Sequence, residues 1–382
     1  MLSIIIPTFN ERENVIKIST YINKILNDFD YELVFVDDST DDTPDFLERL
    51  AKQDAEIKFI HRTNERGLGS AVVEGFKIAN GDIFAVIDAD LQHPPELLLP
   101  MFQAISLDAD VVIPSRFVPG GDDGGLNYLR KLISFGARNL GKVFLKTLRP
   151  ISDATSGYFM FRKKVIDGID LKPIGWKILI EILIKGHYKK VVEIPYKFRS
   201  RTIGQSKMCF QEQWNYIKHL MILLSNNPAE GRFFLFGLIG LSGVFVNTLV
   251  YTMLVSLNVN IIVSGTLAAL VAMLSNFFLN DRYTWIEVKK INLYFRLTKF
   301  ITTSVIGIVI NIAVLASLYQ FLNINYLIAN LSGICFGAIW NYFINNIWTW
   351  KQTDDENDFV VEQWSMKNLL EVRKNEIYYE KN

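Results

Sequence analysis

The segment Ile83-Phe-Ala-Val-Ile-Asp-Ala-Asp-Leu-Gln92 joins a short apolar run to a cluster of polar side chains. Five consecutive apolar residues are typical of a strand that is buried on both faces of a parallel sheet. Runs of the same kind stand at 2–6, 32–36 and 111–113, and helical patterns stand at 12–27, 42–53 and 68–79. Buried strands that alternate with helices predict an α/β fold with a parallel sheet.

Polar residues gather where these strands are expected to end. Pro7-Thr-Phe-Asn-Glu11 follows the first run, Asp37-Asp38 follows the second, and Asp88-Ala-Asp-Leu-Gln92 follows the third. Ligands of open parallel sheets bind beyond the carboxyl ends of the strands. The three clusters are therefore the candidate binding site.

The third cluster has the composition of a site for a divalent cation. Alternation along an extended chain would place Asp88, Asp90 and Gln92 on one side. Three oxygen ligands suit Mg²⁺ or Mn²⁺, and these cations also bind phosphate oxygens. An isolated Asp-x-Asp is often only a solvated turn, but this one follows a buried strand in an acidic segment. We expect a metal site here, with His93 as a turn residue before Pro94 rather than a ligand.

The net charge of zero is the sum of strongly unequal parts. Residues 1–125 hold 10 Lys and Arg against 23 Asp and Glu, whereas residues 126–231 hold 19 against 7. Neutrality of the whole chain argues against a nucleic acid as partner and, taken alone, also against an anionic membrane. The acidic third and the basic third instead predict two different ligands, a cation for the first and an anion for the second.

Two long stretches, 233–280 and 300–350, contain no charged residue. Each is about twice the ~20 residues that cross a bilayer. Each also has a polar break near its middle, at Asn258-Val-Asn260 and Asn323-Ile-Asn325. The sequence therefore predicts four membrane helices, at about 233–255, 261–280, 300–322 and 326–348.

Lysines and arginines near the helix ends set the expected orientation. The loop between the second and third helices holds five of them, and the two turns at the asparagine breaks hold none. This loop, the N-terminal domain and the C-terminal tail are then cytoplasmic in a multi-pass protein of the cell membrane. The expected parts are an N-terminal domain (1–211), an interfacial amphipathic linker (212–231), a membrane domain (232–350) and an acidic tail (351–382).

The membrane segment repeats itself. Residues 275–285 align with 340–350 at an offset of 65, which predicts two tandem helical hairpins with the same orientation. Four asparagines in these helices are costly in lipid and are expected to face the bundle interior: Asn247, Asn276, Asn311 and Asn341. They provide either simple interhelical hydrogen bonds or a polar path for a head group.

A basic amphipathic helix is predicted within 126–149, which carries six Lys and Arg and no acid. Such a helix suits the surface of an anionic bilayer, although it could also pack on the soluble domain. The same two interpretations hold for a second amphipathic stretch at 212–225. Guanidinium and ammonium groups match phosphate, and we assign that role to Arg116, Arg130, Arg201 and Lys207.

Several motifs together resemble family 2 glycosyltransferases of the GT-A fold. They are Pro7-Thr-Phe-Asn-Glu11, Asp37-Asp38, Arg66-Gly-Leu-Gly-Ser-Ala71 and Asp88-Ala-Asp-Leu-Gln-His-Pro94. Further motifs look like the dolichyl (polyprenyl) phosphate mannose synthases, which take mannose from GDP-mannose: Pro114-Ser-Arg116, Arg130-Lys-Leu-Ile-Ser134, Asp153-Ala-Thr-Ser-Gly-Tyr158 and Arg201-Thr-Ile-Gly-Gln-Ser-Lys207. The four-helix part resembles the GtrA-like membrane domain. The resemblance covers about residues 1–350 and leaves the acidic tail outside.

The resemblance implies a role for each matching residue. The base and ribose would contact Pro7, Phe9, Glu11, Val36 and Asp38. The diphosphate and the Mg²⁺ or Mn²⁺ would lie at Asp88, Ala89, Asp90 and Gln92, with Asp88, Asp90 and Gln92 as the metal ligands. The lipid phosphate would contact Arg116, Arg130 and Ser134, and a mobile loop would bring Arg201 and Lys207 to the phosphates. Family members usually have Tyr where this chain has Phe9, so a hydroxyl contact to the base is missing there.

The resemblance implies an inverting transfer of mannose to a polyprenyl (dolichyl) phosphate, with Asp90, Arg116 and Arg130 as the catalytic residues. Three alternatives stay open. A processive polysaccharide synthase would be expected to carry Gln-x-x-Arg-Trp, and the chain has only Gln213-Trp214 without the arginine. An enzyme of the same scaffold could use UDP-glucose or another nucleotide sugar. The membrane repeats could also translocate a lipid-linked sugar.

Overall fold

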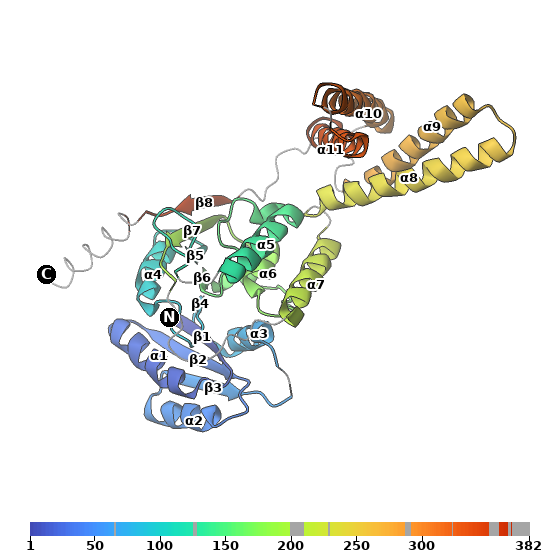
Figure 1. The fold of residues 1–382 in the computed structure, drawn as a ribbon. Coiled ribbons are helices and arrows are strands. Elements are labelled where there is room, and N and C mark those ends of the chain that lie inside the picture. The colour runs from blue at the N-terminus through green and yellow to red at the C-terminus, as the bar shows by residue number, and fades with distance from the viewer. Residues whose placement is uncertain are drawn as a thin grey trace. The chain divides into compact units, whose positions relative to one another are not determined.

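The computed structural model describes residues 1–64, 66–124, 128–198, 210–227, 230–286, 292–322, 324–350, 359–365 and 368. The chain divides into two compact units, Met1–Leu223 together with Asn357–Asn382, and Leu224–Glu356. The first unit holds the predicted sheet, and the second holds the long apolar helices (Figure 1).

Within the described residues, eight strands form one sheet in the order β3-β2-β1-β4-β6-β5-β7-β8. In chain order they are β1 (Leu2–Thr8), β2 (Tyr31–Asp37), β3 (Ile57–His61), β4 (Ile83–Val86), β5 (Val111–Ser115), β6 (Phe159–Arg162), β7 (Lys190–Pro195) and β8 (Val360–Gln363). The four apolar runs of the sequence are β1, β2, β4 and β5. Every residue of β1 and β2 is buried, as continuous apolar runs predict.

One strand departs from the predicted parallel direction. β6 pairs antiparallel with both β4 and β5, with Val86 opposite Phe159 and Val111 opposite Phe161. The prediction of a wholly parallel sheet is therefore wrong at this strand, whereas the α/β fold class is confirmed. An apolar run predicts that a strand is buried but not whether it runs parallel or antiparallel to its neighbours. β6 follows β5 only after a long connection that includes α5 (Tyr128–Phe144).

The predicted helices of this unit are present. α1 (Arg12–Ile25), α2 (Thr43–Gln53) and α3 (Leu68–Ile78) match the predicted ranges within two residues. α1 buries apolar residues spaced by three and four, which place one face of the helix on the core. The other described α-helices of the unit are α4 (Leu98–Ser106), α5, α6 (Ile178–Lys185) and α7 (Phe210–Asn226).

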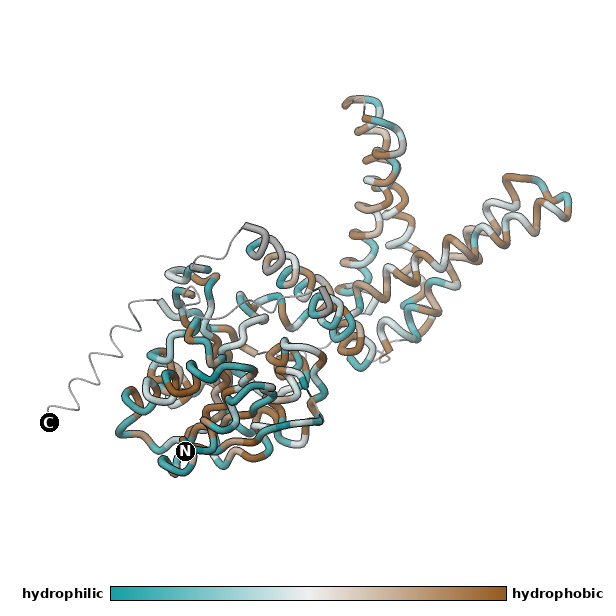
Figure 2. The backbone as a smooth tube through the Cα atoms, turned by 60° about the horizontal axis from the view of Figure 1, so that its bottom comes forward, coloured by the Kyte–Doolittle hydropathy of each residue, from teal (hydrophilic) through white to brown (hydrophobic). Residues whose placement is uncertain are grey.

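The second unit consists of two helical hairpins, α8 (Arg232–Ser256) with α9 (Ile261–Leu279) and α10 (Leu293–Ala316) with α11 (Tyr326–Ile344). Three helices in the described residues are long and apolar enough to cross a membrane, over Arg232–Ser256, Ile261–Thr284 and Leu293–Phe321. Hydrophobic residues predominate along the hairpins in Figure 2. α11 occupies the fourth segment that the sequence predicted.

The third membrane helix begins at Leu293 rather than near residue 300. Asn292 caps it, because the Asn292 side chain accepts a hydrogen bond from the Tyr294 N–H at 2.9 Å. The helix then runs through Arg296 and Lys299 before the uncharged stretch begins. The prediction placed the start of this helix after the last charged residue, Lys299. The cap at Asn292 instead lets the helix begin earlier, with charged residues in its first turns.

The predicted repeat is visible in matching local structure. π-Helical turns end the second helix of each hairpin, η4 (Asn280–Thr284) and η6 (Asn345–Thr349). Trp285 and Trp350 follow these turns and stack, with ring centroids 4.1 Å apart. Trp285 donates a hydrogen bond to Asn346, and Trp350 donates one to Asp281, the residue that matches Asn346 in the other repeat. The two hairpins therefore contact each other through equivalent residues.

Three of the four predicted asparagines, Asn276, Asn311 and Asn341, lie at close contacts between the helices of one hairpin, the second of them against Gly333. A Cβ atom on Gly243 would come within 2.5 Å of the Asn276 amide, and one on Gly307 would come equally close to the Asn341 amide. Small residues that admit a polar side chain are typical of helix packing in membranes.

β8 lies in the region that the sequence analysis left as an acidic tail. It pairs in parallel with β7 and forms one edge of the sheet. A segment that follows the membrane helices in the chain is thus part of the first unit.

Candidate active site

A cavity of about 590 Å³ lies at the carboxyl ends of the strands of the first unit. Its walls come from the loops after β1, β2, β4 and β5, from residues 155–157 and 175–177, and from the first turns of α7. The predicted site residues in its lining are Pro7, Phe9, Glu11, Asp38, Asp88, Ala89, Asp90, Gln92 and Arg116. The fold thus brings the three polar clusters of the sequence to one cavity.

The loop after β1 is fixed by Asn10, which has a left-handed backbone with φ of 56°. Asparagine tolerates this conformation better than most residues. The Asn10 N–H donates a hydrogen bond to Ser39 Oγ at 2.7 Å, which ties this loop to the one after β2. Phe9 and Glu11, on either side of Asn10, both line the cavity.

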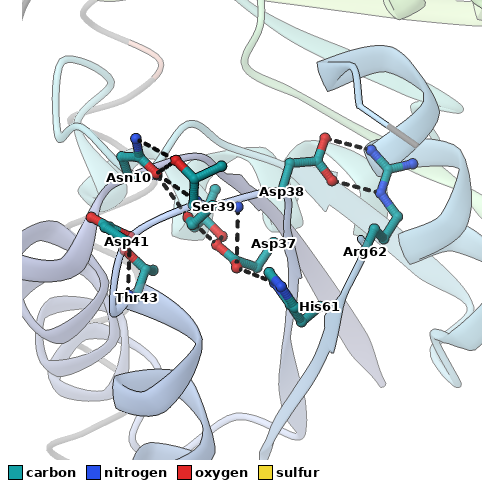
Figure 3. Close-up of polar contacts among 10 residues, drawn as sticks. Asn10, Asp37, Asp38, Ser39, Asp41, Thr43, His61 and Arg62 are labelled. Carbon is teal, nitrogen blue, oxygen red and sulfur yellow. Dashed lines mark hydrogen bonds and ion pairs between the residues drawn. The ribbon is translucent and has the colours of Figure 1, made fainter. Parts of the chain in front are cut away.

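The two aspartates at the end of β2, Asp37 and Asp38, have different surroundings (Figure 3). Asp37 is fully buried and contacts His61 Nδ1 at 2.8 Å. Asp38 lines the cavity, and its two oxygens accept hydrogen bonds from the Arg62 guanidinium at 2.7 Å each. The Gly67 N–H also donates to Asp38, at 2.9 Å. Asp38 is therefore a rigid acceptor that also holds the loop before α3.

The segment from Asp88 to Gln92 is a turn and not an extended chain. Leu91 has a left-handed backbone with φ of 57°, and the Gln92 N–H donates a hydrogen bond to Asp90 Oδ1 at 3.0 Å. The predicted reason for grouping Asp88, Asp90 and Gln92, alternation along a strand, is therefore wrong, because β4 ends at Val86. The turn nevertheless places all three residues in the cavity lining.

The donor set of this turn fits a hard divalent cation. It offers two carboxylates and one amide oxygen in the cavity lining. Within the described residues, at this turn as elsewhere, no group of three or more His, Cys, Asp or Glu side chains is arranged to hold a metal ion. Gly157 faces the Asp88 carboxylate, and a Cβ atom there would lie 3.1 Å from Asp88 Oδ2. The missing side chain leaves room in front of that oxygen.

Arg116 lines the cavity and forms a bidentate ion pair with the fully buried Asp153, at 2.8 and 3.0 Å. Burial alone would lower the pKa of the guanidinium, but the Asp153 carboxylate outweighs it and raises that pKa above the usual value. Arg116 is therefore permanently charged and held in one orientation. Its guanidinium also lies 5.6 Å from the centroid of the Phe198 ring, which lines the same cavity.

Two further side chains of the cavity, Lys177 and His93, were not among the predicted site residues, and His93 was predicted only as a turn residue. Lys177 donates a hydrogen bond to the Thr155 carbonyl at 2.7 Å, and burial together with the Arg116 charge lowers its pKa to about 8. His93 is buried, contacts the Tyr196 hydroxyl at 3.1 Å, and lies 3.6 Å from Asp88 Oδ2. Burial lowers the pKa of His93 to about 4, so this ring is neutral near pH 7.

The second predicted amphipathic stretch, within the basic third, is α7, and it packs on α5 and α6 of the first unit. The Tyr216 hydroxyl donates a hydrogen bond to the Ala137 carbonyl of α5 at 2.7 Å, and His219 lies 3.3 Å from the buried Glu181. Glu212, at the beginning of α7, lines the cavity. No pattern in the sequence predicted this contribution, because it depends on how α7 packs on the rest of the unit.

Of the remaining predicted residues, only Val36 has a described side chain, and it is not part of the cavity lining. Val36 is fully buried in β2, level with Pro7 of β1. Arg130 and Ser134 belong to α5, and their side chains lie outside the described residues, as do Arg201 and Lys207 entirely.

Two known domain families match the chain. Glycosyl transferase family 2 matches residues 3–169, and the GtrA/DPMS transmembrane domain matches residues 235–356. The first match contains the loops after β1, β2 and β4, together with Arg116 and Asp153. The second contains almost all of the two helical hairpins. β8 lies outside both matches.

Curated relatives match either most of the chain or a little more than half of it. A dolichol-phosphate mannosyltransferase from Pyrococcus furiosus is 42% identical over 352 residues, which cover 91% of this chain and 99% of the relative. The dolichol-phosphate mannosyltransferase of Saccharomyces cerevisiae is 33% identical over 57% of this chain and 85% of its own length. An undecaprenyl-phosphate mannosyltransferase from Micrococcus luteus is 34% identical over 53% of this chain and 86% of its own length.

Proposed function

We propose the function of this protein from one premise: the chain belongs to the dolichol-phosphate mannosyltransferases, with a family 2 glycosyltransferase domain followed by a GtrA/DPMS membrane domain. It is a membrane-associated glycosyltransferase of polyprenyl-phosphate mannose synthesis. We propose further that the donor is GDP-mannose and that transfer takes place on the cytoplasmic face of the membrane.

One observation carries the proposal: a single cavity joins the acidic turn 88–92 to Arg116 and Lys177. The transfer must bring one phosphate, on the acceptor, to a sugar whose leaving group is another phosphate. A cavity that holds oxygen ligands on one side and fixed cations on the other suits two anions that would otherwise repel.

The proposed donor side consists of the residues after β1, β2 and β4. Pro7, Phe9, Glu11 and Asp38 would contact the nucleoside, while Asp88, Asp90 and Gln92 would hold Mg²⁺ or Mn²⁺ near the diphosphate. A bound divalent cation would neutralise charge on the leaving diphosphate. The Phe9 ring offers stacking but no hydroxyl, so the rigid Asp38 carboxylate is the stronger candidate for a polar contact.

The proposed acceptor side needs no general base. A phosphate monoester has a second pKa of about 6 and is already an anion at neutral pH. Arg116, held by Asp153, would orient that phosphate beneath the anomeric carbon, with Arg130 and Ser134 of α5 as further contacts. Attack in line with the leaving diphosphate inverts the configuration, so an α-linked donor gives a β-linked lipid product.

Labelled nucleotide sugars distinguish between the possible donors. Membranes that contain the protein are incubated separately with labelled GDP-mannose, UDP-glucose and UDP-N-acetylglucosamine, and the label that enters the organic phase is measured. We expect label from GDP-mannose alone, and expect the Asp90→Ala variant to abolish it. Label from UDP-glucose instead would refute the proposed donor, and near-normal transfer by Asp90→Ala would refute the metal assignment.

A further inference from the structure

β8 is attached to the sheet by backbone pairing and by one large side chain. Its register against β7 runs from Lys190 opposite Val360 to Glu193 opposite Gln363. The Trp364 N–H, just after the strand, donates a hydrogen bond to the Glu193 carbonyl at 2.9 Å. Trp364 is only 7% exposed and packs in the main apolar core of the unit. β8 is thus an integrated edge strand.

A continuous set of hydrogen bonds leads from β8 to the cavity. Gln363 Nε2 donates a hydrogen bond to Ser152 Oγ at 3.1 Å and lies 3.5 Å from Glu193 Oε2. The fully buried Glu193 accepts hydrogen bonds from the Ser152 N–H at 2.8 Å and the Asp153 N–H at 3.1 Å. Asp153 in turn holds Arg116 through two hydrogen bonds. Three contacts therefore connect β8 to Arg116: Gln363 with Glu193, Glu193 with Asp153, and Asp153 with Arg116.

These contacts show that the orientation of Arg116 depends on the position of the Asp153 backbone. Asp153 must present both oxygens to Arg116, and this requires the loop before β6 to hold one position. Glu193 clamps two successive N–H groups of that loop, and Gln363 contacts both the clamp and the loop. Glu193 is held on β7 between two paired strands, β5 on one side and β8 on the other.

We propose that β8 is a positioning element for the transfer reaction, in which Gln363 holds the Glu193 clamp so that Asp153 keeps Arg116 aligned with the acceptor phosphate. The acceptor part of this inference rests on the proposed role of Arg116. Gln363 touches no reacting atom and acts only through its neighbours. β8 lies outside both matched domains.

The test compares three variants of the full-length chain. Gln363→Met keeps the size of the side chain and removes its donors. Gln363→Lys supplies an ammonium group that donates to the same Ser152 and Glu193 oxygens. Glu362→Gln is the matched control on the same strand: Glu362 pairs with Lys190 at 2.9 Å and accepts a hydrogen bond from Trp364 Nε1 at 3.2 Å, and the amide oxygen of glutamine can keep the second contact.

Steady-state kinetics and the thermal unfolding midpoint are measured for each variant. For Gln363→Met we expect kcat/KM for the polyprenyl phosphate to fall about fivefold to tenfold, the loss of about one hydrogen bond. The KM for the nucleotide sugar and the unfolding midpoint should not change. Gln363→Lys and Glu362→Gln should behave as the wild type. Wild-type acceptor kinetics in Gln363→Met, or an equal loss in Glu362→Gln, would overturn the proposal.

Amide hydrogen exchange separates this inference from the proposed function, since it needs no substrate. In Gln363→Met the Ser152 and Asp153 amides should exchange faster than in the wild type, and unchanged exchange would refute the clamp. A wild-type protein that does not transfer mannose would refute the proposed function, and the exchange rates would still decide whether β8 holds the loop.

Discussion

Asp153 is the residue on which the orientation of Arg116 depends most directly. Its carboxylate is fully buried and its charge is matched by Arg116 at 2.8 Å. In Asp153→Asn the guanidinium keeps its charge and loses the partner, and breaking a buried pair in this way typically destabilises by about 3–5 kcal/mol. We expect a lower unfolding midpoint and a loss of transfer of about a hundredfold, typical of a lost positioning contact. Normal activity in this variant would contradict the assigned role of Arg116.

Lys177 provides a prediction on pH. Its pKa in the fold is about 8, below its ordinary value because of burial and the Arg116 charge, so the free enzyme loses this proton as pH rises through about 8. We expect kcat/KM for the nucleotide sugar to fall over the same range, because the cation disappears from the cavity. Lys177→Arg should move this fall to higher pH, since a guanidinium stays protonated.

The control for Lys177 is Lys177→Met, which should be slow at all pH values and lack this fall. A pH profile of Lys177→Met that still falls near pH 8 would assign the titration to another group. The sign for stability is opposite to that for activity. Between pH 8 and about 10.5 the unfolded chain binds more protons than the fold, so the contribution of Lys177 to stability rises with pH there.

The site was predictable from the sequence where its residues are neighbours in the chain. Asp88, Asp90 and Gln92 could be grouped because they follow one strand, even though the turn at Leu91 rather than an extended chain brings them together. The pairing of Arg116 with Asp153 could not be read from spacing, because it joins the loop after β5 to the loop before β6. The place of Lys177 depends on the same long-range packing.

The close packing of α3 on the sheet gives a prediction on stability. A Cβ atom on Gly75 would lie 2.5 Å from Ile5 Cγ2 of β1, and Ile5 is fully buried. Gly75→Ala should therefore destabilise the catalytic unit by about 1–3 kcal/mol, the usual effect of overpacking. Thermal or denaturant unfolding of the purified protein measures this.

Gly136 is the matched control for Gly75. It lies in α5, and no atom lies within 4 Å of the position of an added Cβ. Gly136→Ala should stabilise by about 0.5–1 kcal/mol, because alanine loses less backbone entropy in a helix. Destabilisation of similar size in both variants would contradict the packing explanation.

Elements with strong local patterns were the predictable part of the fold. Apolar runs found β1, β2, β4 and β5, and uncharged stretches found the membrane helices. β3, β6, β7 and β8 were not predicted. A charged residue interrupts the apolar run in three of them, Lys58 in β3, Glu193 in β7 and Glu362 in β8. Such strands depend on pairing with partners far along the chain more than on a local preference.

The orientation of the whole protein in the membrane can be tested at two exposed positions. Leu257 follows α8 and is 62% exposed, and Tyr294 opens α10 and is 78% exposed. In a background where Cys209 and Cys335 are replaced by alanine, Leu257→Cys should react with a membrane-impermeant maleimide added to intact cells. Tyr294→Cys should react only after permeabilisation. The reverse pattern would place the catalytic unit on the outer face.

During synthesis, the sheet of the catalytic unit stays incomplete until β8 has been translated. The ribosome completes β7 at Pro195 and reaches Val360 about 165 residues later, after the two membrane hairpins. At about 5–20 residues per second, the edge of β7 stays open for roughly ten to thirty seconds while those helices enter the bilayer. An open edge strand is a site for mispairing with other chains. A nascent chain that stalls within the membrane segment would thus expose an incomplete enzyme to chaperones and proteases, and closure by β8 would mark a chain whose helices have already been made.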